Sequence, residues 1–342
     1  MAGTEIRAPG RPSSLGEMAN PVESGSLSVA VLICTYNRSE DLDELLSELR
    51  REIIRSDVRT RVIVVDNRST DSTREIVAKH TAACSFIEYY YEGVQGLGQA
   101  RITGCDQVGE EDIIAMIDDD AVPDPGWLTN IVRAFEENPR LGVTGGMIHP
   151  TWRSEVPAWL TRRQMNWLTV NESAVPASCT FPHYPPGANF IVRKEAYREI
   201  EEEIRGINSE LGHTGKKLLS GEDTCISFKI QEAGWDVRYI PAISIHHKIV
   251  PCRLTRKWFA SRYYWEGVSR ARLDHLLERR SLGTVFLHHT FRAGASLMLL
   301  GLTFWHSRQR FFWYCTLLKG IGGMREAVAR ARAGKKSAPG GM

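Results

Sequence analysis

SVAVLICTYNRSEDLDELLSELRREI, residues 28–53, joins a run of apolar and β-branched residues to a helical pattern. Residues 28–37 are typical of a buried strand, because apolar side chains occupy consecutive positions. Over residues 39–53 apolar side chains recur every three to four positions, as on one face of a helix: Leu42, Leu45, Leu46, Leu49 and Ile53. The stretch therefore predicts one β–α unit.

The alternation of strand and helix patterns continues after residue 53. Ser72 and Glu75 are three residues apart at the start of one helical pattern, which predicts a capping box. Strands joined by helical crossovers form parallel sheets. We therefore predict an α/β fold with a doubly wound, mostly parallel sheet, with further strands at 61–67, 85–91 and 112–118 and further helices at 71–80 and 96–108.

The alternation of strand and helix patterns becomes irregular after Met147. Residues 149–187 contain Pro, Trp and Ser and are interpreted as a segment on the substrate side of the sheet rather than as strands. A returning strand is expected at 189–194, a helix at 222–234 and two short strands within 235–249.

Composition places the chain among large globular proteins. It has 342 residues, of which 42% are hydrophobic and 25% charged. The first 26 residues are rich in Gly, Pro and Ser and lack the apolar centre of a secretion signal, so we expect a disordered leader. The 7 cysteines are scattered, without a CxxC pair, which argues against a disulfide framework or a thiolate metal site and favours a cytoplasmic location.

Charge divides the chain into two unequal parts. Residues 248–342 hold 18 Lys and Arg against 4 Asp and Glu, whereas residues 1–247 hold 25 against 37. No zinc-finger or RNP motif accompanies the basic part, so no nucleic-acid partner is expected. Residues 284–305 are long enough to span a bilayer but contain Arg292, which costs ~2.5–3.5 kcal/mol on insertion scales. We expect an amphipathic or packed helix, either against its own chain or in peripheral contact with an anionic inner membrane face.

Three adjacent carboxylates follow the predicted strand 112–118, in the stretch IDDDAVPDPGWL at 117–128. Ligands bind beyond the carboxyl ends of strands in doubly wound sheets. Adjacent carboxylates repel one another unless a cation lies between them, and oxygen ligands favour Mg²⁺ or Mn²⁺ with a phosphorylated substrate. A solvated acidic turn is the alternative interpretation.

Six motifs in order resemble the family 2 inverting glycosyltransferases of the GT-A fold: ICTYNR, VVDNRSTDST, GQARITG, IDDDAVPDPGWL, PPGANFIVRKEAY and GEDTCISFKIQEAGWDVRYIPAISIHH. The resemblance covers about residues 28–250 and implies transfer of a sugar from a nucleoside diphosphate to an acceptor hydroxyl. It divides the chain into a leader (1–26), a catalytic domain (27–250) with a nucleotide-binding half (27–147) and an acceptor half (148–250), and a basic helical extension (251–335).

The resemblance also implies residue roles on the donor side. Asp120 would be the metal-binding carboxylate of a DxD motif, with His246, rather than His247, near the metal. The remaining donor nucleotide-binding residues would be Thr35, Asn37, Asp66, Arg101, Asp118 and Asp119. The alternative for Asp66 is a helix N-cap or an Asx-turn. The alternative for His246 is a histidine on the surface or in the core whose hydrogen bonds are satisfied and which binds no metal.

On the acceptor side the resemblance implies that Asp223 is the general base and Glu222 its orienting neighbour. The alternative for this pair is a structural role, in which acidic side chains at a helix N-terminus complement the helix dipole. Contacts to acceptor or sugar would come from Gly187, Ala188, Asn189 and Trp127, although a tryptophan is more often part of the core.

The expected enzyme is a metal-dependent hexosyltransferase that uses a UDP-sugar, for example UDP-glucose. Its acceptor would be a small secondary metabolite or aminocyclitol, as in antibiotic biosynthesis, or an envelope polysaccharide or glycolipid. A sugar-1-phosphate nucleotidyltransferase should carry a Gly-rich loop after its first strand, where this chain has CTYNRSED. A non-catalytic GT-A binding module would lack Asp120 or Asp223, and a glycosidase would need neither metal nor nucleotide.

Overall fold

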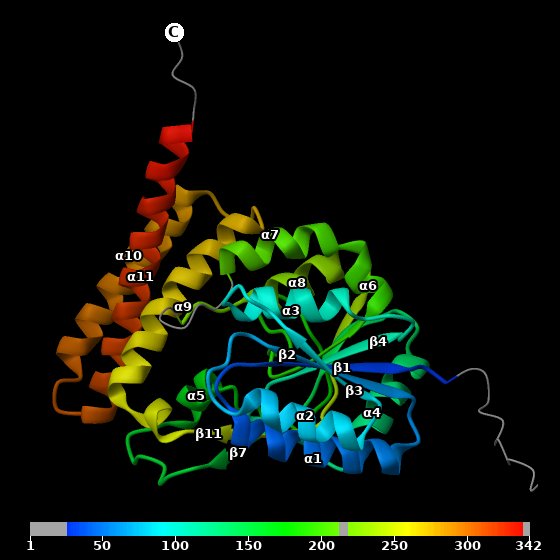
Figure 1. Ribbon diagram of the computed structural model, residues 1–342. Helices are drawn as coiled ribbons and strands as arrows, with labels where there is room; N and C mark the ends of the chain where they lie inside the picture. Colours follow the sequence, from blue (N-terminus) through cyan, green and yellow to red (C-terminus); the bar gives the residue numbers. More distant parts are fainter. Residues whose placement is uncertain (1–25, 212–217, 338–342) are drawn as a thin grey trace, which may run out of the picture.

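The computed structural model describes residues 26–211 and 218–337, so the predicted leader lies almost entirely outside the described residues. Its centre is an eight-stranded sheet of order β3-β2-β1-β4-β9-β6-β10-β8 (Figure 1). The strands are β1 (Val29–Thr35), β2 (Thr60–Asp66), β3 (Ile87–Tyr91), β4 (Ile113–Ile117), β6 (Leu141–Gly145), β8 (Ala177–Ser178), β9 (Asn189–Arg193) and β10 (Asp236–Tyr239). A smaller sheet has the order β5-β11-β7, formed by Ala121–Pro123, Ile245–Ile249 and Ile148–Trp152.

The parallel half of the large sheet confirms the predicted fold class. β1 pairs in parallel with both β2 and β4, and β2 with β3. β9 returns antiparallel between β4 and β6. β2 and β3 lie on one side of β1, whereas β4 lies on the other side. The connections therefore change direction between β1 and β4, and such a switch point opens a crevice beyond the carboxyl ends of the two strands.

Helices cover both faces of the sheet and create two cores. Alternate residues of β1 divide between them: Val29, Val31 and Ile33 face one core, while Ala30 and Leu32 face the other. The first core packs against α1 (Ser39–Ser56), α2 (Thr73–Ala83) and α4 (Trp127–Glu137). The second packs mainly against α3 (Leu97–Asp106), α6 (Lys194–Glu199), α7 (Glu201–Leu211) and α8 (Glu222–Glu232).

Two local predictions are wrong. The Ser72 side chain makes no capping hydrogen bond at the start of α2; instead Asp71 Oδ1 accepts hydrogen bonds from the Thr73 backbone N–H and hydroxyl. Part of the 149–187 segment is sheet, because β7 pairs in parallel with β11. Pro150 is tolerated there because β7 is an edge strand. The segment also contains α5 (Arg162–Met165), the 3-10 turn η1 (Asn166–Leu168) and β8.

The C-terminal extension packs against the rest of the chain. It consists of η2 (Pro251–Leu254), α9 (Arg256–Leu276), α10 (Leu282–Leu302) and α11 (Ser307–Ser337). Phe259 of α9 and Phe311 of α11 share a core with Leu160 and Leu168. Within the described ranges, no helix has the length and apolarity that a bilayer span needs. In Figure 1, α10 and α11 form an arm on the outer side of α9.

Candidate active site

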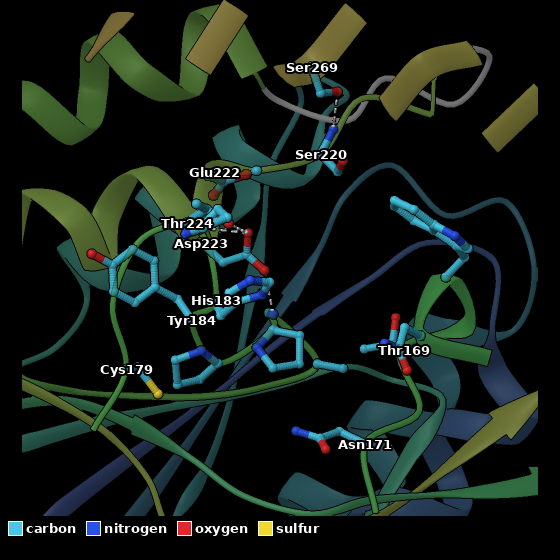
Figure 2. A pocket seen from close by; sticks show the side chains of 18 of the residues that line it. Thr169, Asn171, Cys179, His183, Tyr184, Ser220, Glu222, Asp223, Thr224 and Ser269 are labelled. Atoms are coloured by element: carbon cyan, nitrogen blue, oxygen red, sulfur yellow. Dashed lines mark hydrogen bonds between the residues drawn. The ribbon is translucent and has the colours of Figure 1, made fainter. Parts of the chain in front are cut away.

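A cavity of about 830 Å³ lies beyond the carboxyl end of β4. Its walls come from α3, α8, α9 and the 166–187 segment. Figure 2 shows Asp223 and His183 projecting into it, and Ser220 held at its edge by Ser269 of α9. The structure therefore gathers segments far apart in the sequence around one space, and the extension supplies part of its wall.

Arg101 connects the two acidic parts of this cavity. Its Nη2 donates to the Gly187 carbonyl at 3.2 Å and lies 3.7 Å from Asp118 Oδ1, while Nη1 lies 3.4 Å from Glu222 Oε1. Burial would lower the pKa of Arg101, but the charges of Glu222 and Asp118 outweigh it and raise that pKa. The guanidinium therefore stays charged between the two carboxylates.

The carboxylates at the start of α8 have different environments. Glu222 is buried, and burial raises its pKa against the opposing charge of Arg101. Asp223 is half-buried and lines the cavity. Its Oδ2 accepts the Gly187 N–H at 2.8 Å and its Oδ1 accepts the Thr224 N–H at 2.8 Å. The Thr224 hydroxyl also lies 3.5 Å from Oδ1, so Oδ2 is the oxygen that keeps a further lone pair, and Asp223 is a fixed acceptor facing the cavity.

Positive and hydrogen-bonding groups contact the individual carboxylates of the acidic triplet. Asp120 Oδ2 lies 2.7 Å from Arg38 Nη1, and Asp119 accepts the Thr35 hydroxyl at 2.8 Å. Burial raises the pKa of Asp119 to about 7, although Arg38 opposes the rise. Burial would also raise the pKa of Asp120, but the hydrogen bond from His247 and the charge of Arg38 hold it below its usual range. Arginine side chains therefore relieve part of the repulsion for which the sequence predicted a divalent cation.

His247, rather than His246, lies beside the carboxylates, and this corrects the sequence-based choice. His247 Nε2 lies 3.3 Å from Asp120 Oδ1, and the side chain is 2% exposed. His246 Nε2 instead lies 3.0 Å from Asp124, with 47% of its side chain exposed. The cause is the register of β11, in which His247 pairs with Ala121, the residue after Asp120.

Asp118, Asp120 and His247 form a group that fits a metal ion. One ligand atom from each lies within 4.8 Å of the other two. Arg38 occupies Oδ2 of Asp120, which leaves Oδ1 on the side of His247. Two carboxylates and an imidazole are a common ligand set for a divalent ion.

The predicted nucleotide residues of β1 and β2 lie together at the adjoining strand ends. Thr35 and Asp66 are register partners. Asp66 accepts the Ser69 N–H at 2.8 Å and the Tyr89 hydroxyl at 2.9 Å, so the turn-forming role left open for it is present. Asn37 has a positive φ of 53° and its Oδ1 accepts the Thr70 N–H at 2.7 Å. These groups therefore also hold the loop that follows β2.

Two predicted sugar contacts belong to the core instead. Trp127 and Asn189 are both fully buried, and Trp127 Nε1 donates to Asn189 Oδ1 at 3.2 Å. Their side chains satisfy each other, so the prediction that they contact acceptor or sugar is corrected. Gly187 and Ala188 do line the cavity. A Cβ at Gly187 would lie 2.8 Å from Arg101 Nη2, so a side chain there would displace the guanidinium.

Sequence reasoning missed several residues of the site. Arg38 lies within the quoted ICTYNR motif, and the acid-rich site could have prompted a search for nearby arginines. Arg253 Nη2 also approaches Asp120, at 3.7 Å. Trp167 and His183 line the cavity, as do Arg262, Glu266 and Arg270 of α9. Nothing local in the sequence marks these α9 residues, because the topology alone brings them to the cavity.

Comparisons with known proteins agree with this architecture. Residues 30–201 match the sequence profile of Glycosyl transferase family 2. The chain is 24% identical over 263 residues, 75% of this chain and 80% of the relative, to a glucosyl-dolichyl phosphate glucuronosyltransferase of Haloferax volcanii. It is 25% identical over 256 residues, 72% of this chain and 75% of the relative, to succinoglycan biosynthesis protein ExoM of Rhizobium meliloti. The mannosyltransferase PcManGT of Pyrobaculum calidifontis, solved with GDP-Man and Mn²⁺, has a similar fold, with a TM-score of 0.53 and 18% identity over 92% of this chain and 77% of that one.

Proposed function

Because the chain belongs to glycosyl transferase family 2, we propose that it moves a sugar, with inversion, from a nucleoside diphosphate to an acceptor hydroxyl. One observation carries the proposal. A metal-fitting group, Asp118, Asp120 and His247, meets the cavity at Asp118, and Asp223 faces the same cavity from α8. This arrangement suits a reaction that needs a cation at the leaving group and a base at the nucleophile.

We propose Mn²⁺ as the first metal to test. The mannosyltransferase of similar fold was solved with Mn²⁺. Mg²⁺ strongly prefers oxygen ligands, so the imidazole of His247 favours Mn²⁺ over Mg²⁺. When bound, the ion supplies Lewis-acid stabilisation of the negative charge on the departing diphosphate.

The remaining steps belong to side chains of this chain. Asp223 accepts the proton of the acceptor hydroxyl while the acceptor oxygen bonds to the anomeric carbon and the bond from that carbon to the diphosphate breaks. The backbone N–H groups of Gly187 and Thr224 keep the Asp223 carboxylate in position. Arg101 lies between Glu222 and Asp118 and keeps both carboxylates in position. No covalent intermediate is required.

The donor and acceptor are proposed at the level of chemical class. A UDP-sugar, for example UDP-glucose, is the first donor to test, with Asp66 and Thr35 near the nucleoside. A small hydroxylated metabolite is the first acceptor. A phosphorylated glycolipid is the second, favoured by Arg262 and Arg270 in the cavity wall and by the dolichyl phosphate in the name of the Haloferax relative.

Release of nucleoside diphosphate tests the proposal. The full chain is incubated with UDP-, dTDP- or GDP-sugars and Mn²⁺, with and without EDTA. We expect release from one donor class that stops on chelation and is lost in Asp120→Asn. Metal-independent release, or unchanged release from Asp120→Asn, would contradict the assigned metal site. Release of sugar phosphate and nucleoside monophosphate would contradict glycosyl transfer.

A further inference from the structure

Helix α10 presents an uncharged stripe to solvent along its whole length. Six large apolar side chains are exposed at helical spacing: Phe286, Leu287, Phe291, Leu297, Met298 and Leu302, with Phe291 80% exposed. The other exposed residues of α10 are glycine and threonine. A contiguous apolar surface of this kind marks an interaction site rather than ordinary surface.

The single formal charge of α10 lies off this stripe. Arg292 is half-buried, its Nε is buried, and its Nη2 lies 3.3 Å from His288 Nε2. At 1.5 Å per residue, the exposed apolar side chains from Phe286 to Leu302 make a row roughly 24 Å long. The row is open to one side because α10 lies on the outside of the arm in Figure 1.

The turn after α10 adds aromatic and basic groups. Phe304 and Trp305 are 64% and 63% exposed, and Arg308 and Arg310 follow in the same exposed stretch. Tryptophan next to arginine is typical of the boundary between lipid tails and headgroups. The turn therefore continues the stripe into a zone suited to headgroups.

A second cavity, of about 290 Å³, lies where α9, α10 and α11 meet at this turn. Its lining residues are Arg256, Leu300, Ser307, Arg310, Phe311 and Tyr314, and the surface they present is mostly apolar. A mostly apolar hollow next to the stripe suits a hydrocarbon chain better than a charged group.

Charge decides between a bilayer and a second copy of the chain. A symmetric dimer through α10 would bring two identical basic extensions together, each with 18 Lys and Arg against 4 Asp and Glu over residues 248–342. Anionic headgroups complement that charge. We propose that the stripe of α10 and residues 304–310, from the turn into the start of α11, dock in the plane of an anionic lipid bilayer.

Vesicle sedimentation of the full chain tests this proposal. We expect the chain to pellet with vesicles of phosphatidylcholine and phosphatidylglycerol, far less with phosphatidylcholine alone, and less as salt rises. The double variant Leu287→Asn, Phe291→Asn should bind at least about tenfold more weakly, because two apolar side chains no longer enter lipid. Arg308→Ala, Arg310→Ala should lose the preference for anionic vesicles.

Matched controls come from α1 on the far side of the sheet. Ile54 is 70% exposed and Arg50 is also exposed. Ile54→Asn and Arg50→Ala should bind vesicles like the parent, and circular dichroism confirms that each variant is folded. The proposal is overturned if the parent binds no vesicle, or if controls and arm variants weaken binding equally. It is also overturned if sedimentation velocity shows a parent dimer that Leu287→Asn, Phe291→Asn converts to a monomer.

Discussion

The carboxylate of Glu222 lies 3.4 Å from the guanidinium of Arg101, and both side chains are buried. The other guanidinium nitrogen of Arg101 lies near Asp118 and donates to the Gly187 carbonyl. One planar cation therefore joins the proposed metal end of the cavity to the start of α8. A lysine would not replace it, because an ammonium cannot reach several fixed partners in one plane.

Gly187→Ala should lower kcat by displacing Arg101. The new Cβ would lie 2.8 Å from Arg101 Nη2, tighter than ordinary contact. We expect at least about a tenfold loss of kcat, because small misplacements of positioned groups are costly in catalysis. Gly206→Ala in α7 is the matched control, since an added Cβ there meets no atom of the described residues within 4 Å. Steady-state kinetics of both variants that gave equal kcat values would contradict this account of Gly187.

Asp223→Asn should keep donor binding and lose transfer. The amide retains the size of the carboxylate but cannot take the acceptor proton, so transfer falls by ~10²–10⁴. Calorimetric titration with UDP-sugar and Mn²⁺ measures the first property, and product formation the second. An Asp223→Asn enzyme with parental turnover would show that the base lies elsewhere.

The neighbouring histidines should respond differently to substitution. His247→Ala removes a member of the metal-fitting group, and we expect Mn²⁺ affinity to fall by more than about tenfold. His246→Ala changes an exposed pair with Asp124 and should leave Mn²⁺ affinity unchanged. Electron paramagnetic resonance of free Mn²⁺ reports both constants. Loss of affinity in His246→Ala alone would restore the sequence-based choice.

Glu266 should make the folded state sensitive to acid. Burial would raise its pKa, but Lys319, Arg262 and Arg270 outweigh burial and lower that pKa below its ordinary value. The stability that Glu266 contributes is therefore complete when the pH is above the pKa of this group in the unfolded chain. It is lost as the pH falls through the pKa of the group in the folded chain. Glu266→Gln should lose about 1–3 kcal/mol at pH 7, because it leaves three half-buried cations without their carboxylate, and should show a flatter decline below about pH 5. Urea unfolding of both forms at several pH values measures this; equal slopes would contradict it.

The strands and helices near residues 28–118 could be predicted because their signals are local. An unbroken apolar run gives β1, and a period of 3.6 gives α1. Strand ends then place Thr35, Asp66 and Asp118 at one edge of the sheet. The fold and the donor side of the site follow from these patterns.

The remaining features depend on contacts between distant segments. Alternation along β11 shows that His246 and His247 face opposite sides, but only its pairing with β5 decides which one meets Asp120. Arg38 neutralises carboxylates 82 residues away. Trp127 and Asn189, 62 residues apart, hydrogen bond to each other inside the core. No local pattern encodes these pairings.

The participation of α9 in the cavity wall affects how acceptor preference can be exchanged between relatives. Ser269 binds the Ser220 N–H, and Arg262 donates to the Ser220 hydroxyl, immediately before Glu222 and Asp223. A chimaera joined at residue 250 would thus take the proposed general base, Asp223, from one parent and the α9 side chains that hold Ser220 from another. Successful grafts need to carry residues 166–187, the start of α8 and α9 as a single inherited block.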